Sequence, residues 1–189
     1  GAEQHGHMEA VGYDLYCKLL NQAVLELKGQ RREEDTYETV VDCDIDAYIP
    51  TSYIKNEYQK LDIYKRISSI ENEDEHMDMQ DELMDRFGDI PKPVENLLHV
   101  AAIKALAHGA YVTEVNINSQ EIRLTMYQKA KLNVAGIPAM VERYRGDLKF
   151  HMADEPYFTF IDRRKNQTTA GMMEQAEELL KQLRELTEK

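Results

Sequence analysis

The chain has 189 residues, of which 42% are hydrophobic, so it can form one domain of ordinary size with a buried core. Its formal net charge of −12 and pI near 5.0 disfavour binding to nucleic-acid phosphates and favour a basic protein partner. Its two cysteines, Cys17 and Cys43, lack CxxC spacing, so we expect no disulfide framework or thiolate metal site and a reducing, cytoplasmic setting.

The first part of the chain is predicted to be an N-terminal extension. Hydrophobic residues recur at helical spacing over residues 9–28, and Gly29 offers a stop. The charged, non-periodic run at 29–36 predicts a linker. We therefore expect an extension at 1–36, a main domain at 37–189, and Gly1 to lie inside a longer polypeptide. No run of about 18 apolar residues indicates a membrane helix, and no export signal is seen at the N-terminus.

Residues 39–49 alternate between apolar and polar side chains, which predicts a half-buried strand. Three carboxylates at a spacing of about 6.5 to 7 Å on its outer face could hold a hard divalent cation. An EF-hand is excluded, because Ala47 replaces the turn glycine and Tyr53 replaces the bidentate glutamate. A solvated face is favoured over a metal site for these three aspartates: Asp42, Asp44 and Asp46.

Three helices are predicted next in series. The first spans residues 50–70, with Leu61, Tyr64 and Ile67 on one face. The second lies within 72–89. The third covers 91–109 and buries an apolar face made of Val94, Leu97, Leu98, Ala101, Ala102 and Ala105.

The middle helix, within residues 72–89, carries eight acidic residues and one basic residue, Arg86. Asn72 with Glu75 predicts its start, and Gly88 its end. Helical spacing places five acids on one side: Asp74, Asp78, Asp81, Glu82 and Asp85. It places four apolar side chains on the other: Met77, Leu83, Met84 and Phe87.

Three of these acids, Asp81, Glu82 and Asp85, lie near the C-terminal end of this helix, where negative charge opposes the helix dipole. Like charges at i,i+4 cost roughly 0.2 to 0.5 kcal/mol each. Local helix stability therefore does not explain them. Two interpretations stay open: a solvated surface, or a docking stripe for a basic partner.

The remaining segments predict a mixed sheet with further helices. A hairpin is expected from 111–118 and 121–127, followed by a short helix, two short strands and a long amphipathic helix. Their ranges are 137–144, 148–151, 157–161 and 172–186. The expected fold class is α/β of the α+β type, with a small mixed sheet packed against several helices.

Signatures of catalysis are not found in the sequence. It contains no GxxxxGK[ST] loop, GxGxxG turn, HExxH pair, GxSxG elbow or CxxC pair, so we expect no enzyme activity and no cofactor. His5 and His7 flank Gly6, but no third metal ligand of matching spacing lies nearby.

Two blocks resemble the C-terminal domain of the bacterial transcription-repair coupling factors (the Mfd family). They are LDIYKRIS at 61–68 and DELMDRFGDIPKPVENLL at 81–98. The strand at 39–50 is similar as well. Residues 1–20 are similar to the end of the family's RecG-like translocase module, where Gln4 matches a glutamine thought to couple ATP hydrolysis to movement.

The resemblance implies a regulatory piece of a DNA translocase whose ATPase modules lie elsewhere in the parent protein. In this family the domain docks on a UvrB-like N-terminal module, covers the surface that recruits UvrA, and restrains the motor until RNA polymerase is engaged. The implied contact residues are Glu82 and Asp85, opposite arginines of the partner module. Asp81 and Asp78 are secondary candidates. Tyr64 is expected in the core, and Arg66 is expected to neutralise a neighbouring acid.

Two other classes of function stay open. One is a structural cap that stabilises the motor without regulating it. The other is a metal-binding or enzymatic domain that uses the aspartates at 42, 44 and 46.

Overall fold

The computed structural model describes residues 37–187. Within them the chain forms two compact units: a helical unit of residues 46–102, and a sheet unit of residues 37–45 and 103–187. The helix expected at 9–28, the linker at 29–36, and Gln4, His5, His7 and Cys17 lie outside the described residues. In the described part of the chain, no helix is both long and apolar enough to cross a membrane.

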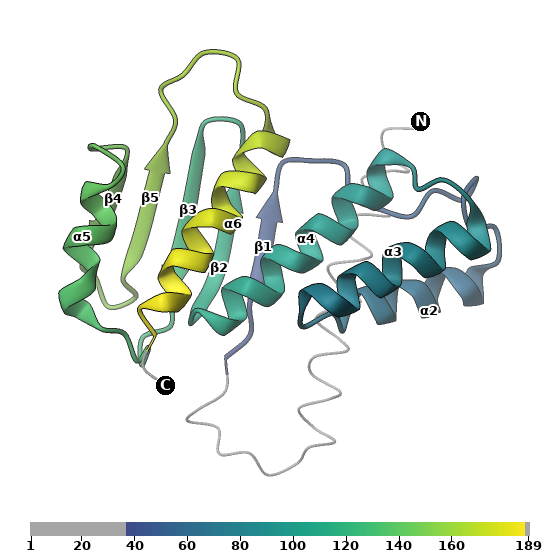
Figure 1. Ribbon diagram of the computed structural model, residues 1–189, viewed down its shortest axis with the longest axis horizontal. Helices are drawn as coiled ribbons and strands as arrows, with labels where there is room; N and C mark the ends of the chain where they lie inside the picture. Colours follow the sequence, from purple (N-terminus) through teal and green to yellow (C-terminus); the bar gives the residue numbers. More distant parts are fainter. Residues whose placement is uncertain (1–36, 188–189) are drawn as a thin grey trace, which may run out of the picture. The chain divides into compact units, whose positions relative to one another are not determined.

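The helical unit contains α2 (Glu57–Ser68), α3 (Glu73–Phe87) and the first part of α4 (Lys92–Gly109) (Figure 1). Helix α2 begins later than the sequence predicted, because Asn56 caps it and accepts a hydrogen bond from the Gln59 amide at 3.0 Å. The residues after Pro50 form a turn instead, in which the Tyr53 amide donates to the Pro50 carbonyl.

Buried apolar side chains from all three helices form the core of this unit. Tyr64 lies in it as expected, 7% exposed, and its hydroxyl accepts from the Ile49 amide at 2.8 Å. The prediction for Leu61 is wrong, since it is 47% exposed and Ile63 is buried instead. The core also contains Ile67, Met79, Leu83, Val94, Leu97, Leu98 and Ala101.

The sheet unit contains a five-stranded sheet in the order β1-β2-β3-β5-β4 (Figure 1). Strand β1 pairs with β2 in parallel, and all other pairs are antiparallel. The sheet is therefore mixed, and the expected α+β class is confirmed. The strands are β1 (Val40–Cys43), β2 (Val112–Ile117), β3 (Glu121–Met126), β4 (Leu148–His151) and β5 (Tyr157–Ile161).

Helix α6 (Thr169–Glu185) crosses the sheet and buries an apolar stripe against it (Figure 1). The buried residues recur with the helical period: Met172, Met173, Ala176, Leu179, Leu180 and Leu183. This confirms the C-terminal amphipathic helix predicted from the sequence. A short 3-10 helix, η1 (Val134–Gly136), precedes α5 (Ile137–Glu142) between strands β3 and β4.

The strand predicted over residues 39–49 ends at Cys43, so that prediction is only partly right. The Asp44 amide still donates to the Ile117 carbonyl at 2.9 Å, but the Ile45 amide then turns back to the Cys43 carbonyl at 2.8 Å. Asp42, Asp44 and Asp46 therefore do not form one row of carboxylates on a strand. Within residues 37–187, no group of three or more His, Cys, Asp or Glu side chains could hold a metal ion.

A pair of neighbouring residues on α3 tests which side of the helix supports the core. Leu83 is fully buried and Met84 is 52% exposed. Leu83→Ala should lower the free energy of unfolding by about 2 to 5 kcal/mol, because it leaves a cavity. Met84→Ala should change it by less than about 0.5 kcal/mol. Urea denaturation of both variants measures the difference, and equal losses would contradict the assigned orientation.

Candidate docking face on helix α3

Both ends of α3 are fixed by the residues that the sequence indicated. Asn72 accepts from the Glu75 amide at 2.9 Å, and the Glu75 carboxylate in turn accepts from the Glu71 amide at 3.0 Å. At the other end Gly88 adopts a φ of 89°, a backbone conformation that side chains disfavour, and its amide donates to the Met84 carbonyl. The predicted start and end of the helix are confirmed.

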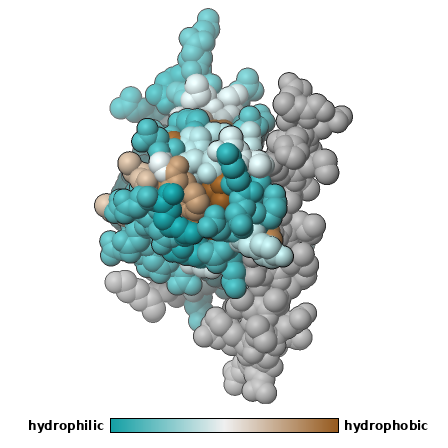
Figure 2. All heavy atoms as spheres, turned by 90° about the vertical axis from the view of Figure 1, so that its right-hand side faces the viewer, coloured by the Kyte–Doolittle hydropathy of each residue, from teal (hydrophilic) through white to brown (hydrophobic). Residues whose placement is uncertain are grey.

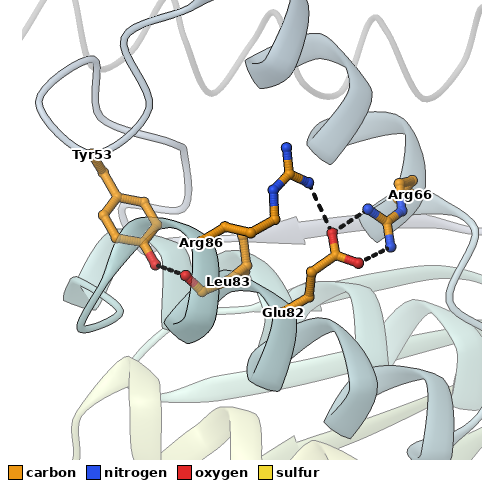
Figure 3. A network of polar contacts seen from close by, with 5 residues as sticks. All are labelled: Tyr53, Arg66, Glu82, Leu83 and Arg86. Carbon is orange, nitrogen blue, oxygen red and sulfur yellow. Dashed lines mark hydrogen bonds and ion pairs between the residues drawn. The ribbon is translucent and has the colours of Figure 1, made fainter.

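The buried side of α3 is narrow. Met79 and Leu83 are buried, and Phe87 packs against the Tyr53 ring with centroids 5.8 Å apart. The Tyr53 hydroxyl donates toward the Leu83 carbonyl at 3.1 Å (Figure 3). The Gly88 carbonyl lies 2.9 Å from the same hydroxyl and shares its single proton, so both contacts hold the helix end in place.

The prediction that Met77 and Met84 share this buried side is wrong, since they are 54% and 52% exposed. The buried positions, 79 and 83, are four residues apart, and they define a stripe too narrow to include positions 77 and 84. Two flexible apolar side chains are thereby left beside the acids. Figure 2 shows that the surface around this part of the molecule is mostly hydrophilic, with a small group of hydrophobic side chains.

Four aspartates line the outer side of α3, and we call them the acidic ridge: Asp74, Asp78, Asp81 and Asp85. All four are exposed. Among the described residues, no lysine, arginine or histidine forms an ion pair with any of them. Within residues 37–187 the ridge is therefore a line of negative charge without ion-pair partners, about three helical turns long.

Glu82 differs from the ridge because two arginines already bind it (Figure 3). Arg66 of α2 forms a two-pronged ion pair with its carboxylate, one hydrogen bond of which measures 2.7 Å, and Arg86 adds a hydrogen bond at 3.0 Å. The hydrogen bond from Arg66 lowers the pKa of Glu82 from 4.5 to about 2; burial opposes this shift and Arg86 reinforces it. The expectation that Arg66 neutralises a neighbouring acid is confirmed.

The structure therefore separates two acids that the sequence treated alike. Glu82, with a side chain 31% exposed, joins α2 to α3. Asp85 is exposed and makes no ion pair within residues 37–187. A partner contact at either residue stays a prediction, but only Asp85 offers a carboxylate that is not already neutralised. One local signal indicated the difference, since Arg86 lies four residues after Glu82.

A domain model, the TRCF domain, matches residues 43–137. The chain is 40% identical over 136 residues to the transcription-repair-coupling factor of Bacillus subtilis (strain 168), which covers 72% of this chain and 12% of that protein. It is 40% identical over 137 residues to the factor of Staphylococcus haemolyticus (strain JCSC1435), with the same coverage.

A solved structure, the crystal structure of the C-terminal domain of transcription-repair coupling factor, matches with a TM-score of 0.66 and 25% identity. The match covers 80% of this chain and 94% of that one. The chain belongs to the TRCF domain family, the C-terminal domains of transcription-repair coupling factors. It spans 12% of the length of the curated relatives described above.

The ion pairs of Glu82 make a pH-dependent prediction. Glu82→Gln should lower the free energy of unfolding at pH 7 by about 1 kcal/mol. Because the folded pKa of about 2 lies below the ordinary value of 4.5, this contribution is complete above pH 4.5 and is lost as the pH falls through 2. Denaturation curves of the wild type and the variant should converge over that window.

The matched control for this experiment is Asp85→Asn, which removes an exposed charge from the same helix. It should not lower the free energy of unfolding at pH 7, and should raise it by up to about 1 kcal/mol, because the Asp85 charge opposes the helix dipole. A gap between wild type and Glu82→Gln that stays constant from pH 7 to pH 2 would show that Glu82 does not act through its charge.

Proposed function

We propose that this chain is an autoinhibitory regulatory domain of a transcription-repair coupling DNA translocase. Its acidic ridge docks on a UvrB-like module at the N-terminal end of the same polypeptide. Docking covers the surface that recruits UvrA until the parent protein engages RNA polymerase on DNA. Membership of the TRCF domain family supports the identity of the parent protein, and the ridge supports the docking role.

The observation that carries this proposal is the position of Asp81 and Asp85. Asp85 lies in the last turn of α3, where negative charge opposes the helix dipole at a cost of about 0.3 to 1 kcal/mol. Asp81 lies four residues before it, and this pair of like charges costs roughly 0.2 to 0.5 kcal/mol. Among the described residues neither forms an ion pair that would offset this cost. An arginine or lysine supplied by another module would offset it, and so the ridge suits a basic partner surface.

Exposed Met77 and Met84 support a protein partner over a simple solvated face. A face tuned only for solubility has no reason to expose two methionines beside its acids, whereas protein interfaces are enriched in methionine. Flexible methionine side chains adapt to irregular partner surfaces. The docking face we propose therefore combines the acidic ridge with an apolar border made by these two residues.

The energetics of such a contact suit a reversible latch. An exposed ion pair contributes about 0 to 1 kcal/mol, so a few of them hold a module without locking it. Arginine that binds a carboxylate with two hydrogen bonds adds a defined orientation. A competing partner needs a differential affinity of only a few kcal/mol to shift the balance toward the open state.

Glu82 takes a different part in this proposal from Asp85. An arginine of the partner module would have to share the Glu82 carboxylate with Arg66 and Arg86, which bind it at 2.7 Å and 3.0 Å. We therefore assign Glu82 first to holding α3 against α2, and thereby to presenting the ridge. Asp85, followed by Asp81 and Asp78, is assigned to the direct contact.

The parent protein, in this proposal, supplies the ATP-dependent motor, and the chain itself does not hydrolyse ATP. Residues 1–36 form the end of the translocase module, and residues 37–189 form the regulatory domain. Gln4 belongs to the segment that couples the motor's ATP cycle to movement along DNA. The setting we propose is the bacterial cytoplasm.

Charge reversal on the ridge tests the latch. Asp81→Lys with Asp85→Lys in the full-length parent protein should raise its basal ATPase rate and its binding of UvrA several-fold, because two attractive contacts become repulsive. Steady-state ATPase assays and UvrA pull-downs measure both effects. A matched control is Asp154→Lys with Glu155→Lys, which reverses two exposed charges in the sheet unit. Unchanged ATPase and UvrA binding in the ridge variant would contradict autoinhibition.

A structural cap is the second candidate function, and the internal ion pairs of Glu82 favour it. Glu82 matches a contact position of the family, but here it forms ion pairs with Arg66 and Arg86 within the helical unit. If the domain only caps the motor, deleting residues 37–189 from the parent protein should lower its melting temperature and leave its ATPase rate per molecule unchanged. If the domain inhibits, the same deletion should raise the ATPase rate. Calorimetry and ATPase assays on one truncation separate the two.

A further inference from the structure

A cluster of arginines in the sheet unit stands out in a chain whose net charge is −12. Two turns come together there, the one between α5 and β4 and the one between β5 and α6, and the Ile161 amide joins them by donating to the Asp147 carbonyl at 3.0 Å. An open cavity of about 440 Å³ lies against both turns. Four arginines line it: Arg143, Arg145, Arg163 and Arg164.

One of the four arginines, Arg164, already binds an acid of its own turn, Asp162. The Arg164 side chain donates two hydrogen bonds to the Asp162 carboxylate, from Nε at 3.1 Å and from one Nη at 2.7 Å. The Arg164 backbone amide donates to the same carboxylate at 2.9 Å. The Asp162 side chain is only 4% exposed, and these contacts lower its pKa. This pair is part of the scaffold that carries the other arginines.

The remaining three arginines, Arg143, Arg145 and Arg163, are exposed, and we call them the arginine cluster. Arg163 makes one loose ion pair with Asp147, at 3.8 Å between side chains that are 77% and 40% exposed. Within residues 37–187, Arg143 and Arg145 form no ion pair. The cluster therefore presents a local excess of positive charge with donors left to bind a ligand.

We infer that the arginine cluster is a second interaction surface, which binds a carboxylate-rich segment of a partner protein. Arginine suits this role because its planar fork matches a carboxylate with two hydrogen bonds, as Arg164 already does with Asp162. Arginine is also among the residues that contribute most to binding energy at protein interfaces. The arginine cluster carries the opposite charge from the acidic ridge. Its inferred binding role does not depend on the role proposed for the ridge.

A nucleic acid fits the cavity less well. Binding of single strands uses aromatic side chains on which bases stack, but Phe160 is 5% exposed and Tyr144 packs edge-on against it with ring centroids 5.7 Å apart. A duplex would bring many phosphates close to a chain whose net charge is −12. Asp147, itself 40% exposed, adds a negative charge inside the site. Asp147 disfavours any anionic ligand, but a short row of carboxylates needs no stacking surface and brings fewer negative charges to the chain than a duplex does.

The test uses the whole 189-residue chain. The probe is a fluorescent, alanine-based helical peptide of about 18 residues with glutamates at i,i+4 spacing, and its glutamine version is the peptide control. Fluorescence anisotropy at about 50 mM salt should show binding of the glutamate peptide only, and the binding should weaken as salt rises. A labelled DNA duplex is titrated in parallel.

The variant Arg143→Gln, Arg145→Gln, Arg163→Gln should bind the peptide at least about tenfold more weakly, because three exposed charge contacts are lost together. The control variant Lys129→Gln, Lys131→Gln, Lys181→Gln removes the same charge from other exposed positions of the sheet unit and should bind like the wild type. Circular dichroism melting of both variants checks that they fold.

Three results would overturn the inference. The first is no detectable binding of the glutamate peptide to the wild type at low salt. The second is equal weakening by both variants, which would show that net charge alone acts. The third is tighter binding of the DNA duplex than of the peptide, lost with the arginine variant, which would assign the cluster to nucleic acid.

Discussion

The burial of Leu83 and Met79 decides what helix α3 shows to its surroundings. An α-helix turns about 100° per residue, so fixing these two side chains in the core fixes the direction of every other residue on the helix. The four aspartates of the acidic ridge then face outward whatever their own energetics, and Met77 and Met84 border them. The Arg66–Glu82–Arg86 cluster strengthens the same arrangement, because it ties α3 to α2 along the side next to the buried stripe. The burial of Met79 and Leu83 in the core therefore determines which side chains of α3 form the proposed docking face.

The chain carries two charged surfaces of opposite sign, one in each unit. On α3 the acids outnumber the cations, and Glu82 is the one acid of this helix that forms an ion pair within residues 37–187; one of its partners, Arg66, belongs to the neighbouring helix α2. Around the cavity of the sheet unit four arginines face two acids, Asp147 and Asp162, and Asp162 anchors a turn through its ion pair with Arg164. In both places the buried or half-buried ion pair builds the scaffold and the exposed charges are left for a partner. This division follows from desolvation, since a partly buried charge must find a partner within the fold, whereas an exposed charge stays hydrated.

Local signals predicted much of this architecture. The caps of α3, the apolar stripe of α6 and the strands β4 and β5 follow from short-range patterns, and the structure has them where the sequence indicated. Three predictions were wrong for one shared reason. Leu61 and the two methionines of α3 are apolar and correctly spaced for a helix face, but the neighbouring elements leave those faces uncovered. The strand after Thr39 alternates as far as residue 49, yet its pairing with β2 ends near Ile117, and the chain turns away.

The sequence by itself determined the kind of each element, the ends of α3 and the excess of acid along it, because caps, periodicity and charge are properties of neighbouring residues. Only the tertiary structure decided which of those acids are neutralised. Arg66 lies sixteen residues before Glu82, and packing of α2 on α3 is what brings the two groups together. The same holds for the arginine cluster, whose members come from turns almost twenty residues apart in the chain that meet because β4 and β5 pair. Contacts of this kind depend on how elements pack, and no local pattern encodes them.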